Sequence, residues 1–156
     1  MATIYVYTDG AARGNPGPSA SGFIIMEEGK RVAHGEFYNG IATNNFAEYN
    51  AVIKALEACA SLYDAKNTDL VVTSDSEVVI RQLNGIYKIK SEKLQELNKR
   101  ASLLATKFKS VKFENARRTS RFISMVDKAI NGLLDKVGEQ EHQSKQDGKK
   151  APSKNI

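Results

Sequence analysis

The amino-acid sequence predicts an α/β fold in which a mixed five-stranded sheet, with three antiparallel strands and then two parallel ones, is flanked by helices. Three β-branched and aromatic segments joined by short turns open the chain, a pattern typical of an antiparallel meander. Short apolar runs follow, and between them lie segments in which apolar residues recur at helical intervals. This pattern indicates strands that are joined through helices. The expected order is β-β-β-α-β-α-α-β-α.

The first three strands are expected before residue 40. Residues 4–8 are mostly β-branched or aromatic and lead into Asp9, and a loop rich in glycine and proline follows at 11–18. Residues 21–26 form the second predicted strand, and a Glu-Gly turn connects it to the third, at 31–38. Turns of this length place successive strands side by side in antiparallel order.

Helical spacing begins after this meander. Small and apolar residues recur at helical intervals across 46–63, and Asn44 or Asn45 is the expected N-cap of that helix. An apolar run at 68–74 predicts the fourth strand. Cys59, the one cysteine of the chain, falls on the apolar stripe of the helix, where we expect it to serve packing rather than a disulfide or a zinc site.

The second half of the chain adds three helices and one strand. A short helix is expected over 76–84, ended by Gly85, and a second helix over 91–108. A short strand is expected at 111–113, before a last helix over 122–137. Apolar residues recur on one stripe of each of the two longer helices, so each should pack on the sheet.

The composition predicts one folded domain over 1–137 and a disordered polar tail over 138–156, where apolar residues become rare. No apolar run approaches the roughly 18 residues of a membrane span. The first residues carry no signal-peptide pattern. We therefore expect a cytoplasmic monomer that has no membrane partner.

Positive charge is concentrated in one segment. The net charge is +5, but residues 1–80 carry 5 Lys or Arg and 10 Asp or Glu, whereas residues 81–121 carry 12 basic residues and 3 glutamates. A basic segment of this kind is either a solvated surface or a surface that follows the phosphates of a nucleic acid. The charge pattern leaves both interpretations open.

Four carboxylates occupy positions where a carboxylate loses water. Asp9 and Asp75 each end a predicted strand, Glu48 lies near the start of the first helix, and Asp127 lies among apolar residues of the last helix. Each alone is compatible with a structural role, such as helix capping. If strands one and four are parallel neighbours, however, Asp9 and Asp75 lie side by side at their carboxyl ends.

A divalent metal would relieve the repulsion among carboxylates this close together. A ligand set made only of oxygen atoms favours Mg²⁺, or alternatively Mn²⁺, over zinc. Two such ions about 3.5–4 Å apart stabilise both the attacking and the leaving oxygen of a phosphoryl transfer. The pattern therefore predicts a metal-dependent phosphoryl-transfer site.

Three blocks of the sequence resemble type 1 ribonuclease H. They are Tyr-Thr-Asp-Gly-Ala-Ala-Arg-Gly-Asn-Pro-Gly-Pro at 7–18, Thr-Asn-Asn-Phe-Ala-Glu-Tyr at 43–49, and Ser-Asp-Ser with the later Gln-Leu-Asn-Gly and Tyr-Lys at 74–88. A fourth block, at 125–131, is similar more loosely. The resemblance covers residues 3 to about 137 and implies the ribonuclease H-like fold.

The resemblance implies an endoribonuclease that hydrolyses the RNA strand of RNA/DNA hybrids by two-metal-ion catalysis, leaving a 3′-OH and a 5′-phosphate. The implied catalytic and metal-binding residues are Asp9, Glu48, Asp75 and Asp127. The implied hybrid contacts are Gly10, Asn15, Thr43, Asn44, Asn45, Glu77, Lys88 and Arg118. The asparagines suit this role because the wide minor groove of an A-like duplex exposes 2′-OH groups that amides recognise.

The chain departs from the family pattern in three places. Glu77 stands where many members have glutamine, so its side chain accepts a hydrogen bond but donates none when ionised. The segment 114–122 has no histidine, although many members carry one there. Residues 86–90 lead directly into the next helix, which implies the branch without a basic helical handle. We expect His34, on an outer strand, to be non-catalytic.

Two alternatives remain open at this point. A chain with this fold can bind nucleic acid with little or no cleavage, and loss of a carboxylate would favour that alternative, but Asp9, Glu48 and Asp75 are all present. A nuclease of the same fold can also act on another substrate, such as DNA. The asparagines favour recognition of 2′-OH groups instead.

Overall fold

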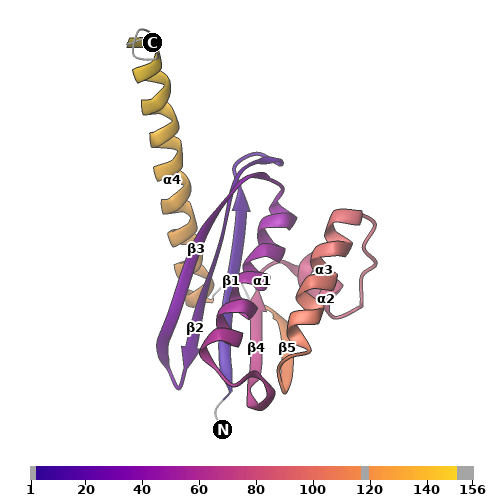
Figure 1. The fold of residues 1–156 in the computed structure, drawn as a ribbon. Helices are drawn as coiled ribbons and strands as arrows, with labels where there is room; N and C mark the ends of the chain where they lie inside the picture. Colours follow the sequence, from indigo (N-terminus) through magenta and orange to yellow (C-terminus); the bar gives the residue numbers. More distant parts are fainter. Residues whose placement is uncertain (1–2, 117–119, 151–156) are drawn as a thin grey trace.

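One five-stranded sheet, with its strands in the order β3-β2-β1-β4-β5, organises the chain (Figure 1). The computed structural model describes residues 3–116 and 120–150. β1 pairs antiparallel with β2 and parallel with β4, while β3 lies antiparallel to β2 and β5 parallel to β4. The strands are β1 (Ile4–Ala12), β2 (Gly17–Glu27), β3 (Lys30–Ala42), β4 (Asp69–Ser74) and β5 (Ser110–Asn115). The predicted mixed sheet is confirmed.

Helices cover both faces of this sheet. They are α1 (Asn44–Leu62), the 3-10 turn η1 (Ala65–Asn67), α2 (Glu77–Leu83), α3 (Glu92–Ala105) and α4 (Arg121–Lys150). α1 packs on one face together with α3, and α4 packs on β1, β2 and β3 (Figure 1). The predicted order of elements is confirmed, and the described residues between α2 and α3 form no helix, as expected for the branch without a handle. None of the described helices is apolar enough over a sufficient length to cross a membrane.

The alternation of side chains along β2 divides the core into two clusters. Phe23 and Ile25 pack towards α1, in a cluster with Val52 and Leu56. The intervening residues of β2 face the other way and pack against α4, in a cluster that contains Ile24, Met26, Val126, Ile130 and Leu134. A strand that is buried on both sides in this way separates two hydrophobic cores. Cys59 lies fully buried in the α1 cluster, as expected.

The first three strands are longer than the sequence predicts. β1 continues through Asp9 to Ala12, and β2 begins at Gly17 rather than at Ser21. The added segments contain mainly Gly, Ala, Ser and Pro, which are typical of loops. Here they form strands because residues 9–12 of β1 pair with residues 19–22 of β2, and most of the added residues of β2 are buried.

Thr43 is the N-cap of α1, so the prediction that Asn44 or Asn45 caps this helix is wrong. The Thr43 hydroxyl oxygen accepts a hydrogen bond from the backbone N–H of Phe46 at 3.1 Å. The three consecutive residues are all good capping residues, and propensity alone did not rank them. The N-caps of α2 and α3 are serines at positions 76 and 91.

The last helix is longer than predicted. α4 continues to Lys150 instead of ending at residue 137, and residues 151–156 lie outside the described part of the chain. The disordered tail over 138–156 stays a prediction. The loss of apolar residues after Val137 ends the packing stripe, but Glu, Gln and Lys are good helix formers and sustain the backbone helix. Figure 1 shows this second half of α4 extending beyond the sheet. The domain boundary at residue 137 stays a prediction.

Candidate active site

Asp9 and Asp75 meet at the centre of the sheet, at the carboxyl end of β4. β1 and β4 are parallel neighbours with Thr8 opposite Ser74, so the next residue of each segment is an aspartate. One carboxylate oxygen each from Asp9, Asp75 and Glu48 lie within 4.8 Å of one another. The structure thus brings three of the four candidate carboxylates together, and it places Asp9 and Asp75 side by side as expected for parallel neighbours.

Glu48 reaches this cluster because β1 and α1 touch backbone to backbone. A Cβ atom added to Gly10 would lie 2.3 Å from the carbonyl carbon of Ala47 and 2.5 Å from the backbone nitrogen of Glu48. The Gly10 N–H donates a hydrogen bond to Glu48 Oε1, and the Ser21 hydroxyl donates one to the Ala47 carbonyl oxygen at 2.6 Å. Any side chain at residue 10 would push α1, and Glu48 with it, away from Asp9.

Asp127 lies on α4 and approaches from the face of the sheet that is opposite to α1. Gly22 is the cross-strand partner of Asp9, and directly opposed residues share a face. A Cβ atom on Gly22 would lie 2.7 Å from a methyl carbon of Ile130 and 3.0 Å from one of Val126, so α4 sits close to the sheet at this point. Asp127 extends from the helix there and is exposed, whereas Asp9 and Glu48 are only 5% and 7% exposed.

The carboxylates of the cluster share an unfavourable electrostatic environment. Burial raises the pKa of Asp9 to about 8, and the charges of Asp75 and Asp127 add to the effect. Burial also raises the pKa of Glu48 well above its ordinary value, against the opposing hydrogen bond from Gly10. The pKa of Asp75 is raised by burial and by the charge of Asp127. Each added negative charge therefore costs free energy in the absence of a cation.

A divalent cation fits this donor set. The ligand atoms within reach are carboxylate oxygens on three residues, which suits a hard ion that takes oxygen ligands. A cation among them would favour the ionised carboxylates and thereby remove the cause of the raised pKa values. The site can hold a divalent metal ion.

Four of the predicted hybrid contacts line one pocket at the N-terminal end of α1. Asn15, Thr43, Asn44 and Asn45 lie around it together with residues of the N-terminal turn of α3. The Asn44 side-chain oxygen accepts a hydrogen bond from the Ala12 N–H at 2.8 Å, and the Asn15 side-chain oxygen accepts one from the Asn44 N–H at 3.1 Å. These bonds join the loop after β1 to the start of α1.

Lys93 is a pocket residue that the sequence reasoning missed. It lines the same pocket, and its Nζ atom lies 5.0 Å from the centre of the Phe46 ring. It belongs to the basic segment 81–121, but nothing in its local sequence distinguishes it from the other lysines there. Only the packing of α3 beside α1 brings it to the asparagines.

Of the other predicted contacts, Glu77 and Lys88 do not line this pocket, and Arg118 lies outside the residues that the structure describes. Glu77 is at the start of α2, and its Oε1 atom accepts a hydrogen bond from Arg81 Nε at 2.8 Å. Lys88 is exposed in the connection between α2 and α3. The charge of Glu77 is therefore balanced within its own helix.

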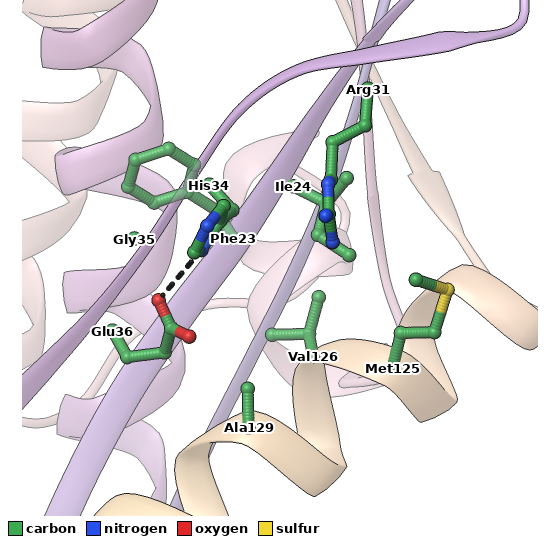
Figure 2. A pocket seen from close by; sticks show the side chains of 9 residues that line it. All are labelled: Phe23, Ile24, Arg31, His34, Gly35, Glu36, Met125, Val126 and Ala129. Carbon is green, nitrogen blue, oxygen red and sulfur yellow. Dashed lines mark hydrogen bonds and ion pairs between the residues drawn. The ribbon is translucent and has the colours of Figure 1, made fainter.

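A second, smaller cavity opens between β2, β3 and α4 (Figure 2). His34 and Glu36 line it, with the His34 Nδ1 atom 3.1 Å from a carboxylate oxygen of Glu36. Met125 and Val126 close its other side. None of the four carboxylates of the candidate site is among its lining residues, so His34 lies apart from the candidate site.

Comparison with known proteins finds ribonucleases H among the relatives of this chain. A family model described as "Reverse transcriptase-like" matches residues 7–129. A ribonuclease HI of Halobacterium salinarum is 38% identical over 133 residues, which make up 85% of this chain and 64% of that protein. A bifunctional protein of Mycobacterium tuberculosis is 31% identical over 85% of this chain and 35% of its own length. The chain thus spans between about a third and two thirds of the length of these relatives.

Solved structures of ribonucleases H are also similar to this chain. The N-terminal RNase H domain of a Mycobacterium tuberculosis protein superimposes with a TM-score of 0.81 at 29% identity, covering 90% of this chain and 99% of that chain. LC11-RNase H1, isolated from compost, gives a TM-score of 0.81 at 35% identity, covering 88% of this chain and 99% of that chain. A structure of LC11-RNase H1 in complex with an RNA/DNA hybrid gives 0.75 at 35% identity, covering 85% and 99%.

Proposed function

The chain belongs to the type 1 ribonuclease H family, and from this membership we propose that it is an endonuclease that hydrolyses the RNA strand of RNA/DNA hybrids. The observation that carries the proposal is the cluster of Asp9, Glu48 and Asp75, whose carboxylate oxygens lie within 4.8 Å of one another. A structural neighbour that was solved with an RNA/DNA hybrid supports the choice of substrate.

Asp9, Glu48 and Asp75 are the proposed ligands of Mg²⁺ or Mn²⁺, and Asp127 is the proposed fourth ligand. Two ions bound with the substrate would supply an activated water molecule and neutralise charge at the scissile phosphate. Cleavage would leave a 3′-OH and a 5′-phosphate. The raised pKa values of Asp9 and Glu48 support this assignment, because they indicate carboxylates that lack a compensating positive charge.

Asn15, Thr43, Asn44 and Asn45 are the proposed contacts to the minor groove and to a phosphate of the hybrid. Their gathering around one pocket supports this proposal, and Lys93 adds a positive charge to the same pocket. Amide groups recognise a 2′-OH as both donor and acceptor, which favours a hybrid over DNA. Gly10 acts in this proposal through its packing against α1 rather than through a side chain.

Other parts of the basic segment are proposed to follow the phosphate backbone. Lys88 is exposed beside α2, as a phosphate contact requires. Glu77 can still accept a hydrogen bond from a 2′-OH, because an ionised carboxylate has two acceptor oxygens and the bond from Arg81 goes to Oε1. All four carboxylates come from one chain, which supports a monomeric enzyme. Its location in the cytoplasm stays a prediction.

The test compares labelled RNA/DNA, RNA/RNA and DNA/DNA duplexes in the presence of Mg²⁺ or Mn²⁺. We expect cleavage of the RNA strand of the hybrid only. Cleavage of DNA/DNA would indicate a nuclease of another specificity, and binding without cleavage would indicate a binding module. Either result would refute the proposed activity.

The variant Asp9→Asn should lose metal-dependent cleavage, by more than about 1,000-fold, and still bind the hybrid. Asp69→Asn is the matched control, because Asp69 lies at the opposite end of the β4 strand and accepts a hydrogen bond from Ser110 at 2.6 Å. Full activity of Asp9→Asn would contradict the assignment of the site.

A further inference from the structure

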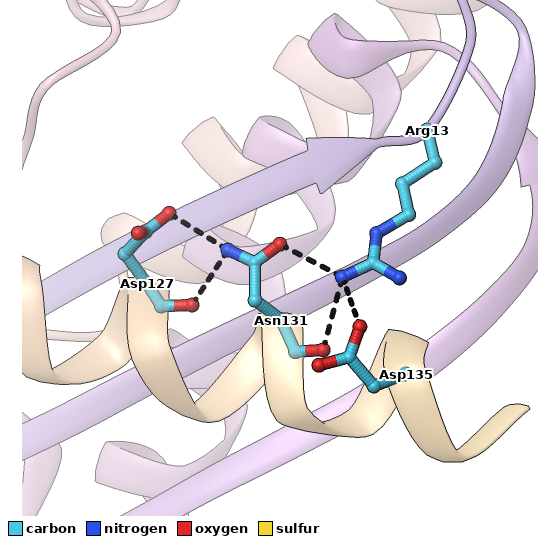
Figure 3. A network of polar contacts seen from close by, with 4 residues as sticks. All are labelled: Arg13, Asp127, Asn131 and Asp135. Carbon is cyan, nitrogen blue, oxygen red and sulfur yellow. Dashed lines mark hydrogen bonds and ion pairs between the residues drawn. The ribbon is translucent and has the colours of Figure 1, made fainter. Parts of the chain in front are cut away.

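Asn131 lies on α4 between Asp127 and Arg13, and its side-chain amide contacts both (Figure 3). The Nδ2 group donates hydrogen bonds to the Asp127 carbonyl oxygen at 2.9 Å and to Asp127 Oδ1 at 3.2 Å. The Oδ1 atom accepts one from Arg13 Nη2 at 3.3 Å, and the backbone oxygen of Asn131 accepts another at 3.2 Å. Arg13 also pairs with Asp135 Oδ1 at 2.7 Å.

The chemistry of arginine fixes the orientation of this amide. A guanidinium group only donates hydrogen bonds, so the Asn131 side chain must present its oxygen to Arg13. The amide nitrogen then faces the neighbouring turn, where Asp127 lies four residues earlier on the same helix face. The two Asp127 oxygens favour the same orientation, but without Arg13 nothing would hold the amide oxygen, and the side chain would be freer to leave Asp127.

Asp127 needs such support more than the other carboxylates. Asp9 is held within a sheet strand and Glu48 by a backbone N–H, and both are buried. Asp127 is exposed on a helix surface, where its side chain has room to turn away from the cluster. The amide of Asn131 restricts this motion by holding one carboxylate oxygen.

We propose that Arg13 and Asn131 are positioning residues for Asp127: Arg13 orients the Asn131 amide, and the amide holds the carboxylate towards Asp9 and Asp75. The proposal rests on the proposed function in one respect, namely that Asp127 is a metal ligand. Because Arg13 lies two residues before Asn15, it also links the loop proposed to meet the hybrid to the fourth ligand of the metal site.

The test measures Mn²⁺ binding to the full chain without nucleic acid, by isothermal titration calorimetry. Outer ligand-orienting groups typically contribute 10- to 100-fold to metal affinity, and for the half-buried Asn131 we expect a loss of about tenfold in Asn131→Ala. Arg13→Met should lose roughly threefold, since the Asn131 amide then keeps its contacts with Asp127 but loses the partner that holds its oxygen. Arg100→Met is the matched control, because Arg100 pairs with Glu57 away from the site, and its affinity should equal that of wild type.

A double-mutant cycle shows whether the effect passes through Asp127. In an Asp127→Asn background, Asn131→Ala should cause no further loss of Mn²⁺ affinity. Three results would overturn the proposal: an unchanged affinity in Asn131→Ala, an equal loss in the Asp127→Asn background, or an Asp127→Asn variant that binds Mn²⁺ as tightly as wild type.

Hybrid cleavage by the wild-type chain is measured separately. Absence of cleavage would refute the proposed function, while the Mn²⁺ cycle would still decide the positioning role. Thermal unfolding of each variant confirms that the chain is folded under the conditions of the titration.

Discussion

The two sides of the candidate site are held in different ways. On the α1 side, Gly10 places β1 against the backbone of α1, and the buried Glu48 accepts a backbone hydrogen bond. On the α4 side, Gly22 faces side-chain methyl groups, and the exposed Asp127 is held by the side chain of Asn131. The first arrangement depends on backbone contact and the second on side chains. The α1 side should therefore tolerate less change than the α4 side.

The largest effect is expected from Gly10→Ala on the α1 side. The new methyl group would meet backbone atoms at 2.3–2.5 Å, which only a shift of the helix can relieve. We expect a loss of stability of about 3 kcal/mol, measured by urea unfolding, and a loss of cleavage of more than about 100-fold. Gly138→Ala is the control, since nothing lies within 4 Å of that position. Equal behaviour of the two variants would show that backbone contact at Gly10 is unimportant.

The second largest effect is the pH dependence of the free energy of unfolding in metal-free protein. The pKa of Asp9 is about 8 in the folded state, above the value near 4 in the unfolded state. Between these values the folded state binds more protons, so the free energy of unfolding falls as pH rises, by at most about 1.4 kcal/mol per pH unit for one proton. Thermal unfolding in EDTA from pH 5 to 8 measures this fall, and saturating Mg²⁺ should reduce it.

Two variants show which carboxylates cause this pH dependence. Asp9→Asn should reduce the slope, because it removes one of the three carboxylates whose pKa is raised and, with it, a charge that raises the pKa of Glu48. Asp127→Asn should leave a clear slope, because burial is the largest cause of the raised pKa of Asp9 and remains in this variant. A flat profile in the metal-free wild type would contradict the electrostatic description of the cluster.

Gly22→Ala tests the α4 side at the position paired with Asp9. The new methyl group would lie 2.7 Å from a side-chain carbon of Ile130 and 3.2 Å from the Gly35 carbonyl oxygen, so its closest contact is with a side chain of α4 rather than with backbone. We expect a loss of stability of about 1–2 kcal/mol in urea unfolding, smaller than for Gly10→Ala. A loss as large as that of Gly10→Ala would show that α4 is held as rigidly as α1.

The smallest effect concerns the start of α1. Thr43→Ala removes the N-cap and should lower stability by about 1 kcal/mol, measured by chemical unfolding. Asn45→Ala should leave stability nearly unchanged and weaken hybrid binding, because Asn45 lines the pocket but does not cap the helix. The reverse result would assign the cap to Asn45.

Most of the α1 side could be predicted from the sequence. Asp9 and Asp75 follow β-branched segments, and parallel pairing brings the ends of such strands together. The resemblance to the family then identified Glu48. The length of β1 could not be predicted, because Gly10 to Ala12 have the composition of a loop and form a strand through pairing with residues 19–21 of β2.

The support of Asp127 could not be predicted at all. Arg13 and Asn131 are 118 positions apart, and neither residue type is unusual in its local segment. Their contact exists because α4 crosses the sheet beside the end of β1. Similarly, the helical course of residues 138–150 could not be deduced from hydrophobic patterning, which reports packing rather than helix propensity.

The edge position of β3 has a consequence for the behaviour of the protein at high concentration. An edge strand of 13 residues offers unpaired backbone groups to a second chain, which is a common route to aggregation. β3 carries Lys30, Arg31 and Glu36, and its register with β2 shifts at two places. Charges and irregular register both hinder pairing between edges, so we expect this sheet to resist addition of a sixth strand from a neighbouring copy.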